Sequence, residues 1–442
     1  MEIVEREQVQ TERHAPAANW TSPARVAFRF CFVYFGAYSL STQIVTSFLP
    51  LPNLDIPDPS AFWPIRPIVF WTAAHIFRVS KPLVYTGSGS GDKTFDWVLQ
   101  FCILMFAILV TAIWSALDRK RFNYGTLYKW FRLVIRFCLA GQMMGYGMAK
   151  AVPLQMPFPF LTLLMERFGD FSPMGVLWSS IGTAPAYEMF AGCAELLGGM
   201  LLVFPRTTTI GALVCLADMI QVFMLNMTYD VPVKLLSFHL ILLSLFLLAP
   251  DVKRLINLFV LNRPAKPAPH PPLFRGSRAN RIAFAVQIVV GIWLLGMNAY
   301  SRKVSWYQYG GGRTLSPLYG IWDVEQQVVD GQIRVPLLTD SGRWRRVSFD
   351  FPTRVTFQRM DDSFAWHGAS IDVKNKTLVI TDDRDKNWKA NFNFERSGQD
   401  QMTLDGSMDG HQVHMQLKRI DLNRFRLVSR GFHWVQEYPY NH

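Results

Sequence analysis

The chain has 442 residues, of which 50% are hydrophobic and only 18% are charged, whereas an ordinary soluble domain has roughly 25% charged residues. This composition disfavours a soluble enzyme, and the apolar residues gather in runs of about 20, each long enough to cross about 30 Å of hydrocarbon. The net charge of +12 lies mainly in residues 1–300, where 25 Lys and Arg accompany 16 Asp and Glu, against 20 and 17 in the remainder. Because the positive excess lies with the apolar runs, we expect a protein whose partner is the lipid bilayer and not nucleic acid.

The cysteines give no indication of a metal or disulfide site. All five lie inside apolar runs, and no two are close enough in sequence to form a CxxC pattern. The acidic residues of the C-terminal region occupy turn-like positions without the spacing of a calcium loop. We therefore expect no metal site.

Seven membrane crossings are expected from the long apolar runs. They are placed at residues 26–49, 95–117, 127–149, 186–204, 208–228, 232–249 and 282–299. Two further stretches, 62–79 and 154–165, are interrupted by prolines and are more typical of interfacial or re-entrant segments.

The distribution of Lys and Arg between the connections predicts the orientation. With a cytoplasmic N-terminus, the inner connections hold 15 of these residues and the outer ones hold seven, as the positive-inside rule requires. The expected organisation is a cytoplasmic tail (1–25), N-terminal spans with an outside loop (26–125), a four-helix bundle (126–255), a basic proline-rich cytoplasmic linker (256–281) and a last span (282–300). Residues 310–442 then lie outside a bacterial cell membrane, in the periplasm.

From about residue 310 the pattern changes to short alternating stretches separated by turn residues such as Asp330-Gly331 and Asp409-Gly410. This pattern predicts a small antiparallel β barrel. The expected strands are Leu318–Val329, Arg345–Phe349, Arg354–Arg359, Phe364–Val373, Thr377–Thr381, Trp388–Phe394, Gln401–Leu404, Gln412–Arg419 and Arg424–Val428.

A glycine-rich stretch, Gly87–Thr94, has a sequence similar to that of a phosphate-binding loop. However, Asp92 occupies the position of a required glycine, and no strand precedes the stretch. We expect an ordinary flexible loop.

Polar residues inside apolar spans are the stronger functional signal, because a charge near the bilayer centre is costly and is normally held within a bundle or at a cavity. Glu195, Asp218 and His239 fall at similar depths in three successive helices and are expected to converge. These residues are compatible with three roles. They pair to hold the bundle, they line a quinone cavity in which carboxylate and histidine exchange protons, or they form a proton or substrate pathway. The candidate intramembrane residues are Arg136, Gln142, Glu188, Glu195, Asp218, Gln221 and His239.

A second polar group is expected near the outer ends of the same helices. Its candidate residues are Lys150, Asn226, Asp230 and Lys234. Lys150, one turn after Tyr146, is alternatively an anchor that snorkels to the interface.

Residues 126–255 resemble the DoxX/DoxD-like membrane family. The resemblance depends on the run Gly145–Lys150, on Glu188–Gly199 followed by Pro205-Arg206, and on Asp230–Leu235 with Leu247–Asp251. It implies a four-helix membrane bundle and an association with quinone-linked redox complexes. The absence of paired cysteines from the sequence argues against thiol-disulfide exchange.

Two further resemblances concern the C-terminal region. Gly320-Ile-Trp322 and Arg430 resemble the lipocalin pattern, which implies that an arginine closes over the first-strand tryptophan. Such a barrel can hold a small lipophilic ligand or be filled and serve for docking. The order of membrane helices and an outside β domain is similar to that of vitamin K-dependent carboxylase-like proteins, whose catalytic lysine has no assigned counterpart here.

The sequence therefore predicts an all-α membrane bundle of about seven helices, with a DoxX-like core, followed by an antiparallel, lipocalin-like β barrel. The leading functional hypothesis is a quinone-interacting accessory subunit with a membrane redox partner. A carrier or assembly protein that uses the barrel, and a carboxylase-like enzyme, are the alternatives.

Overall fold

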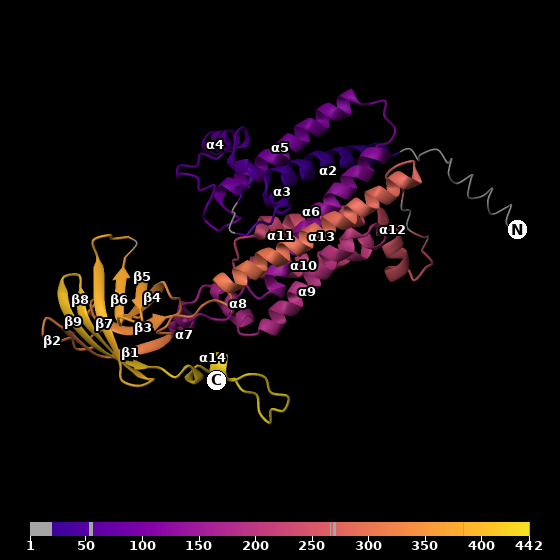
Figure 1. Cartoon of the computed structure of the whole chain (residues 1–442). Coiled ribbons are helices and arrows are strands. Elements are labelled where there is room, and N and C mark those ends of the chain that lie inside the picture. Colours follow the sequence, from indigo (N-terminus) through magenta and orange to yellow (C-terminus); the bar gives the residue numbers. More distant parts are fainter. Residues whose placement is uncertain (1–19, 53–55, 266, 268–270, 383, 442) are drawn as a thin grey trace. The chain divides into compact units, whose positions relative to one another are not determined.

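A computed structural model describes residues 20–52, 56–265, 267, 271–382 and 384–441 (Figure 1). The described chain divides into two compact units. The helical unit contains the residues up to Val152 together with Met189–Val304, and the barrel unit contains Pro153–Glu188 and the chain from Ser305 onward. Most of the predicted cytoplasmic tail, residues 1–19, lies outside the described residues.

Seven long helices correspond to the seven predicted spans. They are α2 (Ser22–Ser41), α5 (Thr94–Leu117), α6 (Gly125–Ala151), α9 (Pro185–Val203), α10 (Thr208–Thr228), α11 (Lys234–Leu248) and α13 (Ser277–Gln308). Among the described residues, five helical segments are long and apolar enough to cross a membrane: Thr94–Leu117, Pro185–Val203, Pro205–Thr228, Lys234–Val260 and Ser277–Gln308. The chain is thus a membrane protein by its helices, while α2 and α6 are not among these five segments.

The cations of α2 and α6 have partners within the helical unit. Arg29 of α2 donates hydrogen bonds to Tyr124 and to the Asp118 carbonyl at the end of α5. On α6, Arg136 donates to the Gln287 side chain and Lys150 pairs with Glu195. Because each of these charges finds a protein partner, a helix that carries it can pack inside a bundle.

Several segments differ from the predicted boundaries. The first predicted span divides at Thr42, where the backbone is extended, into α2 and the short helix α3 (Gln43–Thr46). The start of the predicted linker is helical, because a π-helix at Ile256–Val260 continues α12 (Val252–Leu255). The proline-interrupted stretches contain only the short helices α4 (Ile65–His75) and α7 (Leu161–Met165).

Glycines allow α6, α9 and α10 to approach closely. A Cβ on Gly192 of α9 would lie 2.3 Å from the Ala151 amide nitrogen and 2.6 Å from the Gly147 carbonyl of α6. A Cβ on Gly198 would lie 2.9 Å from Cys215 Sγ of α10. These contacts are too short for any side chain larger than hydrogen, so the glycines fix where the three helices cross.

The C-terminal region forms a closed antiparallel barrel of eight strands. The strands run in chain order, and the last pairs with the first through contacts such as Val324 with Leu417. They are β1 (Gly320–Val329), β3 (Trp344–Phe349), β4 (Arg354–Arg359), β5 (Phe364–Asp372), β6 (Thr377–Thr381), β7 (Lys389–Arg396), β8 (Gln401–Met408) and β9 (His411–Arg419). The two-residue strand β2 (Gln332–Ile333) pairs only with β1.

Eight of the nine predicted strands match this barrel, and the ninth is wrong. Residues Arg424–Val428 contain the end of a 3-10 turn and most of a short helix, α14 (Arg426–Ser429). Pairing between β1 and β9 closes the barrel and leaves no free edge for another strand. The predicted hairpin turns agree with the backbone, since Asp330 and Gly331 have φ of 49° and 79°, as a type I′ turn requires.

Apolar side chains fill the barrel interior. On β7 the burial alternates strictly from Lys389 to Phe394, which places every second residue inside. Residues with no solvent exposure include Trp322, Val347, Phe349, Leu378, Ile380, Ala390, Leu404 and Met415. The interior is therefore a packed hydrophobic core.

The connection between α6 and α9 belongs to the barrel unit. The Leu161 amide donates a 2.9 Å hydrogen bond to the Asp350 carboxylate, which also pairs with Arg313 at 2.5 Å. The Asp362 carboxylate pairs with both Arg167 of the connection and Arg345 of β3. These two parts of the chain are therefore in contact within the barrel unit. Four long helices, α9, α10, α11 and α13, separate them in the sequence.

Candidate functional site

The helical unit contains a cavity of about 370 Å³ lined by α2, α3, α5, α6 and α11 and by the glycine-rich loop. Its polar lining includes Tyr38, Gln43, Gln100 and Tyr146. The cavity also borders an ion pair in which Lys93 Nζ lies 2.9 Å from Asp96 Oδ2. Its volume falls within the usual range of roughly 300–1,000 Å³ for small-molecule sites.

A chain of hydrogen bonds leads from this cavity to His239. Gln100 Nε2 donates to Tyr34 Oη at 2.5 Å, and Tyr34 Oη lies 3.0 Å from His239 Nε2. His239 Nδ1 lies 2.6 Å from the Leu235 carbonyl oxygen. Because a carbonyl can only accept, Nδ1 carries the proton, and in the neutral ring Nε2 accepts from the tyrosine.

The imidazole is further held by aromatic stacking. The Tyr38 ring stacks on the His239 ring with a centroid distance of 3.8 Å. The Tyr34 ring also stacks on the His239 ring, with a centroid distance of 5.9 Å. Since Tyr38 lines the cavity and His239 is only 1% exposed, the histidine lies behind the cavity wall. Both its orientation and its tautomer are fixed by neighbours.

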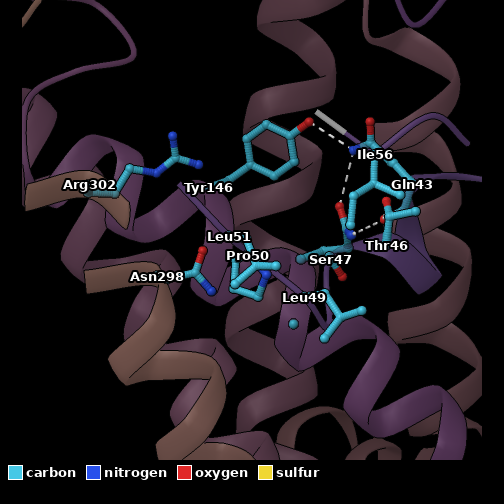
Figure 2. A pocket seen from close by; sticks show the side chains of 13 residues that line it. Gln43, Thr46, Ser47, Leu49, Pro50, Leu51, Ile56, Tyr146, Asn298 and Arg302 are labelled. Carbon is cyan, nitrogen blue, oxygen red and sulfur yellow. Dashed lines mark hydrogen bonds between the residues drawn. The ribbon is translucent and has the colours of Figure 1, made fainter. Parts of the chain in front are cut away.

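The cavity shares Gln43, Thr46 and Tyr146 with a second pocket (Figure 2). Gln43 Nε2 donates to Tyr146 Oη at 2.9 Å and to Gln142 Oε1 at 3.2 Å. These three side chains come from α3 and α6 and connect the two helices by neutral hydrogen bonds. Gln142, predicted from its depth in the span, is thus placed beside a cavity.

Glu195 and Asp218 belong to a different cluster. Lys150 and Glu195 form an ion pair in which both residues are buried. Gly198 of α9 packs on Cys215 of α10. Glu195 lies three residues before Gly198 and Asp218 lies three residues after Cys215. Because the two helices are antiparallel, this spacing places the two carboxylates together. The charges of Glu195 and Lys150 act on Asp218. Within the described chain, Glu195 Oε2 and Asp218 Oδ2 are buried without hydrogen-bond partners.

The predicted convergence of Glu195, Asp218 and His239 is therefore only partly realised. His239 bonds to Tyr34 of α2, whereas the two carboxylates lie with Lys150. Arg136, the cation among the predicted intramembrane residues, bonds to Gln287 of α13. The sequence predicted how deep in its span each polar residue lies. It did not predict toward which neighbouring helix that residue points.

Two other predicted intramembrane residues have surroundings of their own. Glu188 accepts hydrogen bonds from the Gln155 and Met156 amides at 3.1 and 2.9 Å, and it belongs to the barrel unit. Gln221 is exposed on α10.

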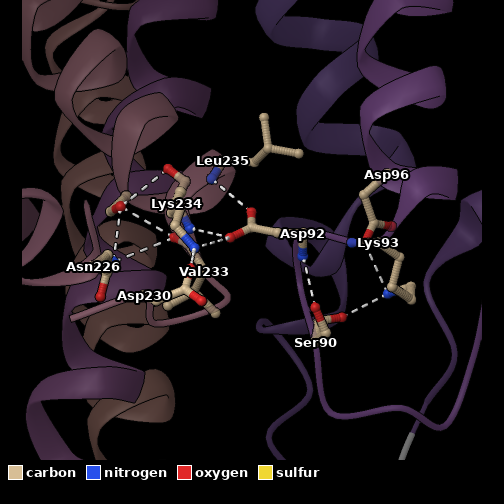
Figure 3. Close-up of polar contacts among 10 residues, drawn as sticks. Ser90, Asp92, Lys93, Asp96, Asn226, Asp230, Val233, Lys234 and Leu235 are labelled. Carbon is tan, nitrogen blue, oxygen red and sulfur yellow. Dashed lines mark hydrogen bonds and ion pairs between the residues drawn. The ribbon is translucent and has the colours of Figure 1, made fainter. Parts of the chain in front are cut away.

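Three of the four predicted outer residues come together with the glycine-rich loop (Figure 3). Asp92 accepts hydrogen bonds from the Lys234 and Leu235 amides at 2.7 and 2.9 Å, where a carboxylate compensates the positive end of α11. Lys234 Nζ pairs with Asp230 at 2.8 Å, and Asn226 donates to Ser237 at 3.0 Å. Lys150, the fourth, lies in the Glu195 pair.

Asp92 thus has a structural role. It attaches the glycine-rich loop, expected to be an ordinary flexible loop, to the first turn of α11. The loop lines the 370 Å³ cavity, so this attachment also shapes the candidate site.

The predicted pairing of Trp322 with Arg430 is wrong. Arg396 of β7 lies over the Trp322 ring at 5.6 Å, and the indole nitrogen donates to the Leu318 carbonyl at 3.0 Å. Arg430 lies 3.8 Å from the Tyr440 ring centroid. An arginine does cover the first-strand tryptophan. It is Arg396 of β7, however, and not Arg430, which the lipocalin resemblance suggested.

The sequence analysis did not identify Tyr34, Tyr38, Gln43 and Gln100. They are neutral, so a search for charges inside apolar spans passes over them. The available signal was spacing: Tyr34 and Tyr38 are four residues apart and therefore share a helix face.

Comparison with known proteins adds one distant similarity. The chain is 28% identical over 133 residues to the uncharacterised protein YwoB of Bacillus subtilis strain 168, a match that covers 28% of this chain and 79% of YwoB. No family model and no solved structure matches the sequence.

Proposed function

We propose that this chain is a multi-pass protein of a bacterial cell membrane that binds a lipophilic molecule with a carbonyl-bearing head group, of the quinone type. The head group occupies the 370 Å³ cavity. The observation that carries the proposal is the Gln100–Tyr34–His239 hydrogen-bond chain, which begins at the cavity wall and ends at a buried imidazole.

The chemistry of the lining suits such a head group. Quinone carbonyls accept hydrogen bonds, and the amide of Gln100 and the hydroxyl of Tyr38 are neutral groups able to donate them. A buried neutral donor is costly when its partner is absent, so these groups favour a ligand with matching acceptors. When bound, a quinone would supply electron and proton acceptance, and the protein's part is to orient the carbonyls and to hold a polar path beside them.

The proposed setting is a seven-crossing protein with a cytoplasmic N-terminus and a periplasmic barrel, acting as a DoxX-like accessory subunit beside a membrane redox partner. The even number of long helices between residues 188 and 305 supports the connection after α6 and the barrel lying on one side. The excess of Lys and Arg in the opposite connections supports that side being the periplasm. Glu195 and Asp218, with unpartnered oxygens beside Lys150, would then hold protons within the membrane.

The other hypotheses have less support. A packed interior suits a lipocalin-like barrel that serves for docking or assembly better than one that carries a lipid. A carboxylase-like enzyme would need a free lysine, whereas Lys150 is engaged by Glu195 and Lys234 by Asp230.

Binding of a short-chain quinone to the full-length protein in neutral-lipid nanodiscs tests the proposal. Quenching of tryptophan fluorescence gives the dissociation constant, and Gln100→Leu is expected to weaken binding about tenfold, the effect of losing one well-placed hydrogen bond. His239→Phe, which keeps the stack and loses the bond to Tyr34, should weaken it less.

Gln221→Leu is the matched control, because it makes the same kind of change on an exposed face of α10. Its dissociation constant should equal that of the unmodified protein. Absence of saturable quinone binding, or equal affinities for Gln100→Leu and Gln221→Leu, would refute the proposed site.

A further inference from the structure

The second pocket, on the other side of the Gln43–Tyr146 wall, contains a cation without a counter-charge. The pocket has a volume of about 290 Å³ and is bounded by α3, α6, α13 and the chain around Leu49–Leu51. Arg302 of α13 lines it, and none of the described residues that line it is acidic. Figure 2 shows the Arg302 side chain extended from α13 beside Tyr146.

Arg302 has a guanidinium nitrogen that the protein does not satisfy. Its Nε is buried and has no hydrogen-bond partner in the described part of the chain, and this residue forms no ion pair there. The Nε of Arg136 is likewise buried without a partner, but Arg136 donates to Gln287 through Nη2. Arginine presents five donors in a planar fork that matches the oxygens of phosphate, sulfate and carboxylate groups. An unpaired fork at a cavity therefore indicates an anionic ligand.

Neighbouring groups extend the donor set. Tyr146 Oη accepts from Gln43 at 2.9 Å, which leaves its own proton available to an acceptor. Asn298, four residues before Arg302 on α13, is buried and uses its amide nitrogen to donate to the Leu294 carbonyl at 2.8 Å, so its second N–H remains for a ligand. The charge of Arg302 acts on Tyr146, as do the charges of Glu195 and Asp58.

Two glycines of α6 keep the pocket open. Gly141 and Gly145 are four residues apart and both line it. A Cβ on Gly145 would lie 3.6 Å from Asn298 Oδ1, which is an ordinary contact distance. A larger side chain at this position would therefore project into the pocket without a backbone clash.

We infer that the pocket at Arg302, Asn298 and Tyr146 binds a small oxyanion of the phosphate type, either as the head group of an anionic lipid or as a free ion. The site shares the Gln43–Tyr146 wall with the proposed quinone cavity, but Arg302 and Asn298 line only this pocket. Arg302 supplies the charge, and the neutral donors of Asn298 and Tyr146 fix the orientation of the oxygens.

Thermal unfolding of the full-length protein in nanodiscs tests this inference, because a ligand that binds only the folded state raises the midpoint with concentration. One arm titrates inorganic phosphate into phosphatidylcholine nanodiscs, with chloride at matched ionic strength as reference. The other arm replaces part of the phosphatidylcholine with phosphatidylglycerol and adds no phosphate. A response to phosphate identifies a free ion, and a response confined to phosphatidylglycerol identifies a lipid head group.

Variants connect the response to the pocket. Arg302→Gln should weaken binding at least about tenfold and, since Arg302 has no partner to lose, should fold normally. Gly145→Leu should abolish the response because the leucine side chain fills the pocket, although Arg302 is still present. Lys303→Gln, which removes the exposed neighbouring cation of the same helix, should respond as the unmodified protein does.

The inference is overturned if neither anion source raises the midpoint, or if Arg302→Gln and Gly145→Leu respond as Lys303→Gln does. The quinone proposal is tested by Gln100→Leu, which should leave the anion response unchanged. Failure of one proposal is thus distinguishable from failure of the other.

Discussion

The helical and barrel units bury different kinds of side chain. The helical unit encloses Gln142, Glu195 and His239, each at most 2% exposed, and it contains two cavities with polar walls. The barrel interior consists of large apolar side chains such as Trp322 and Phe349, both with no exposure.

This difference separates the tasks of the two units. A polar group buried in a membrane bundle is expensive unless it is paired or used, so its presence locates candidate chemistry in the helices. A packed apolar core stabilises a fold but offers no binding space. The barrel's ionic contacts, such as the pair of arginines on Asp362, instead attach the connection between α6 and α9. The barrel unit therefore contributes a packed fold that holds this connection in place.

The largest effect is expected at the buried ion pair. Glu195→Leu leaves Lys150 as a buried, unpaired charge, which should lower the free energy of unfolding by about 3–5 kcal/mol. Denaturant unfolding of the full-length protein in detergent measures it. The double variant Lys150→Met/Glu195→Leu removes both charges and should recover most of this loss. Equal destabilisation of the single and double variants would show that the charges themselves are not the cause.

A core truncation in the barrel should cost somewhat less. Leu378 has no solvent exposure, and Leu378→Ala leaves a cavity expected to lower stability by about 2–5 kcal/mol. Hydrogen exchange of the β5–β7 amides reports this loss. Trp366→Ala on β5, where the side chain is 63% exposed, should change stability by less than about 0.5 kcal/mol. Similar values for both would contradict a packed interior.

The contact at Asp362 should have a smaller effect. Its carboxylate is 9% exposed and accepts from two arginines, so Asp362→Asn should cost about 1–3 kcal/mol locally. We expect faster trypsin cleavage after Arg167, because the connection loses its attachment to the barrel. Asp361→Asn is the control, since its carboxylate bonds to Ser363 of the same turn. An unchanged cleavage rate for Asp362→Asn would argue against this attachment.

The smallest effect concerns acid stability of the barrel. A 2.7 Å hydrogen bond from His411, with another from the Gln412 amide, lowers the pKa of Asp330 below its usual value. A carboxyl whose folded pKa is depressed contributes stability above its unfolded pKa of about 3.9 and loses it as pH falls through the folded pKa. Asp330→Asn should therefore lower the barrel's melting temperature slightly at pH 6 and not at pH 2. An equal difference at both pH values would exclude the carboxylate as the cause.

Much of the secondary structure could be predicted from the sequence because it depends on local periodicity. The strands Arg354–Arg359 and Thr377–Thr381 were predicted with their observed bounds, since alternation over five or six residues is a local signal. The Asp330-Gly331 turn was predicted for the same reason. The Arg424–Val428 strand was wrong because closure of the barrel, which depends on pairing between its two ends, removed the edge it needed.

The sequence by itself determined that this is a membrane protein, where its apolar helices lie along the chain, and that a β barrel follows them. These properties depend on composition and short-range period, which any single segment displays. Only the tertiary structure decided that Glu195 pairs with Lys150, that His239 faces Tyr34, and that Arg302 lines a pocket without an acidic residue among its described lining. Those outcomes depend on how each helix is rotated about its axis, and that rotation is set by contacts between distant segments, such as the glycine crossings of α6 with α9.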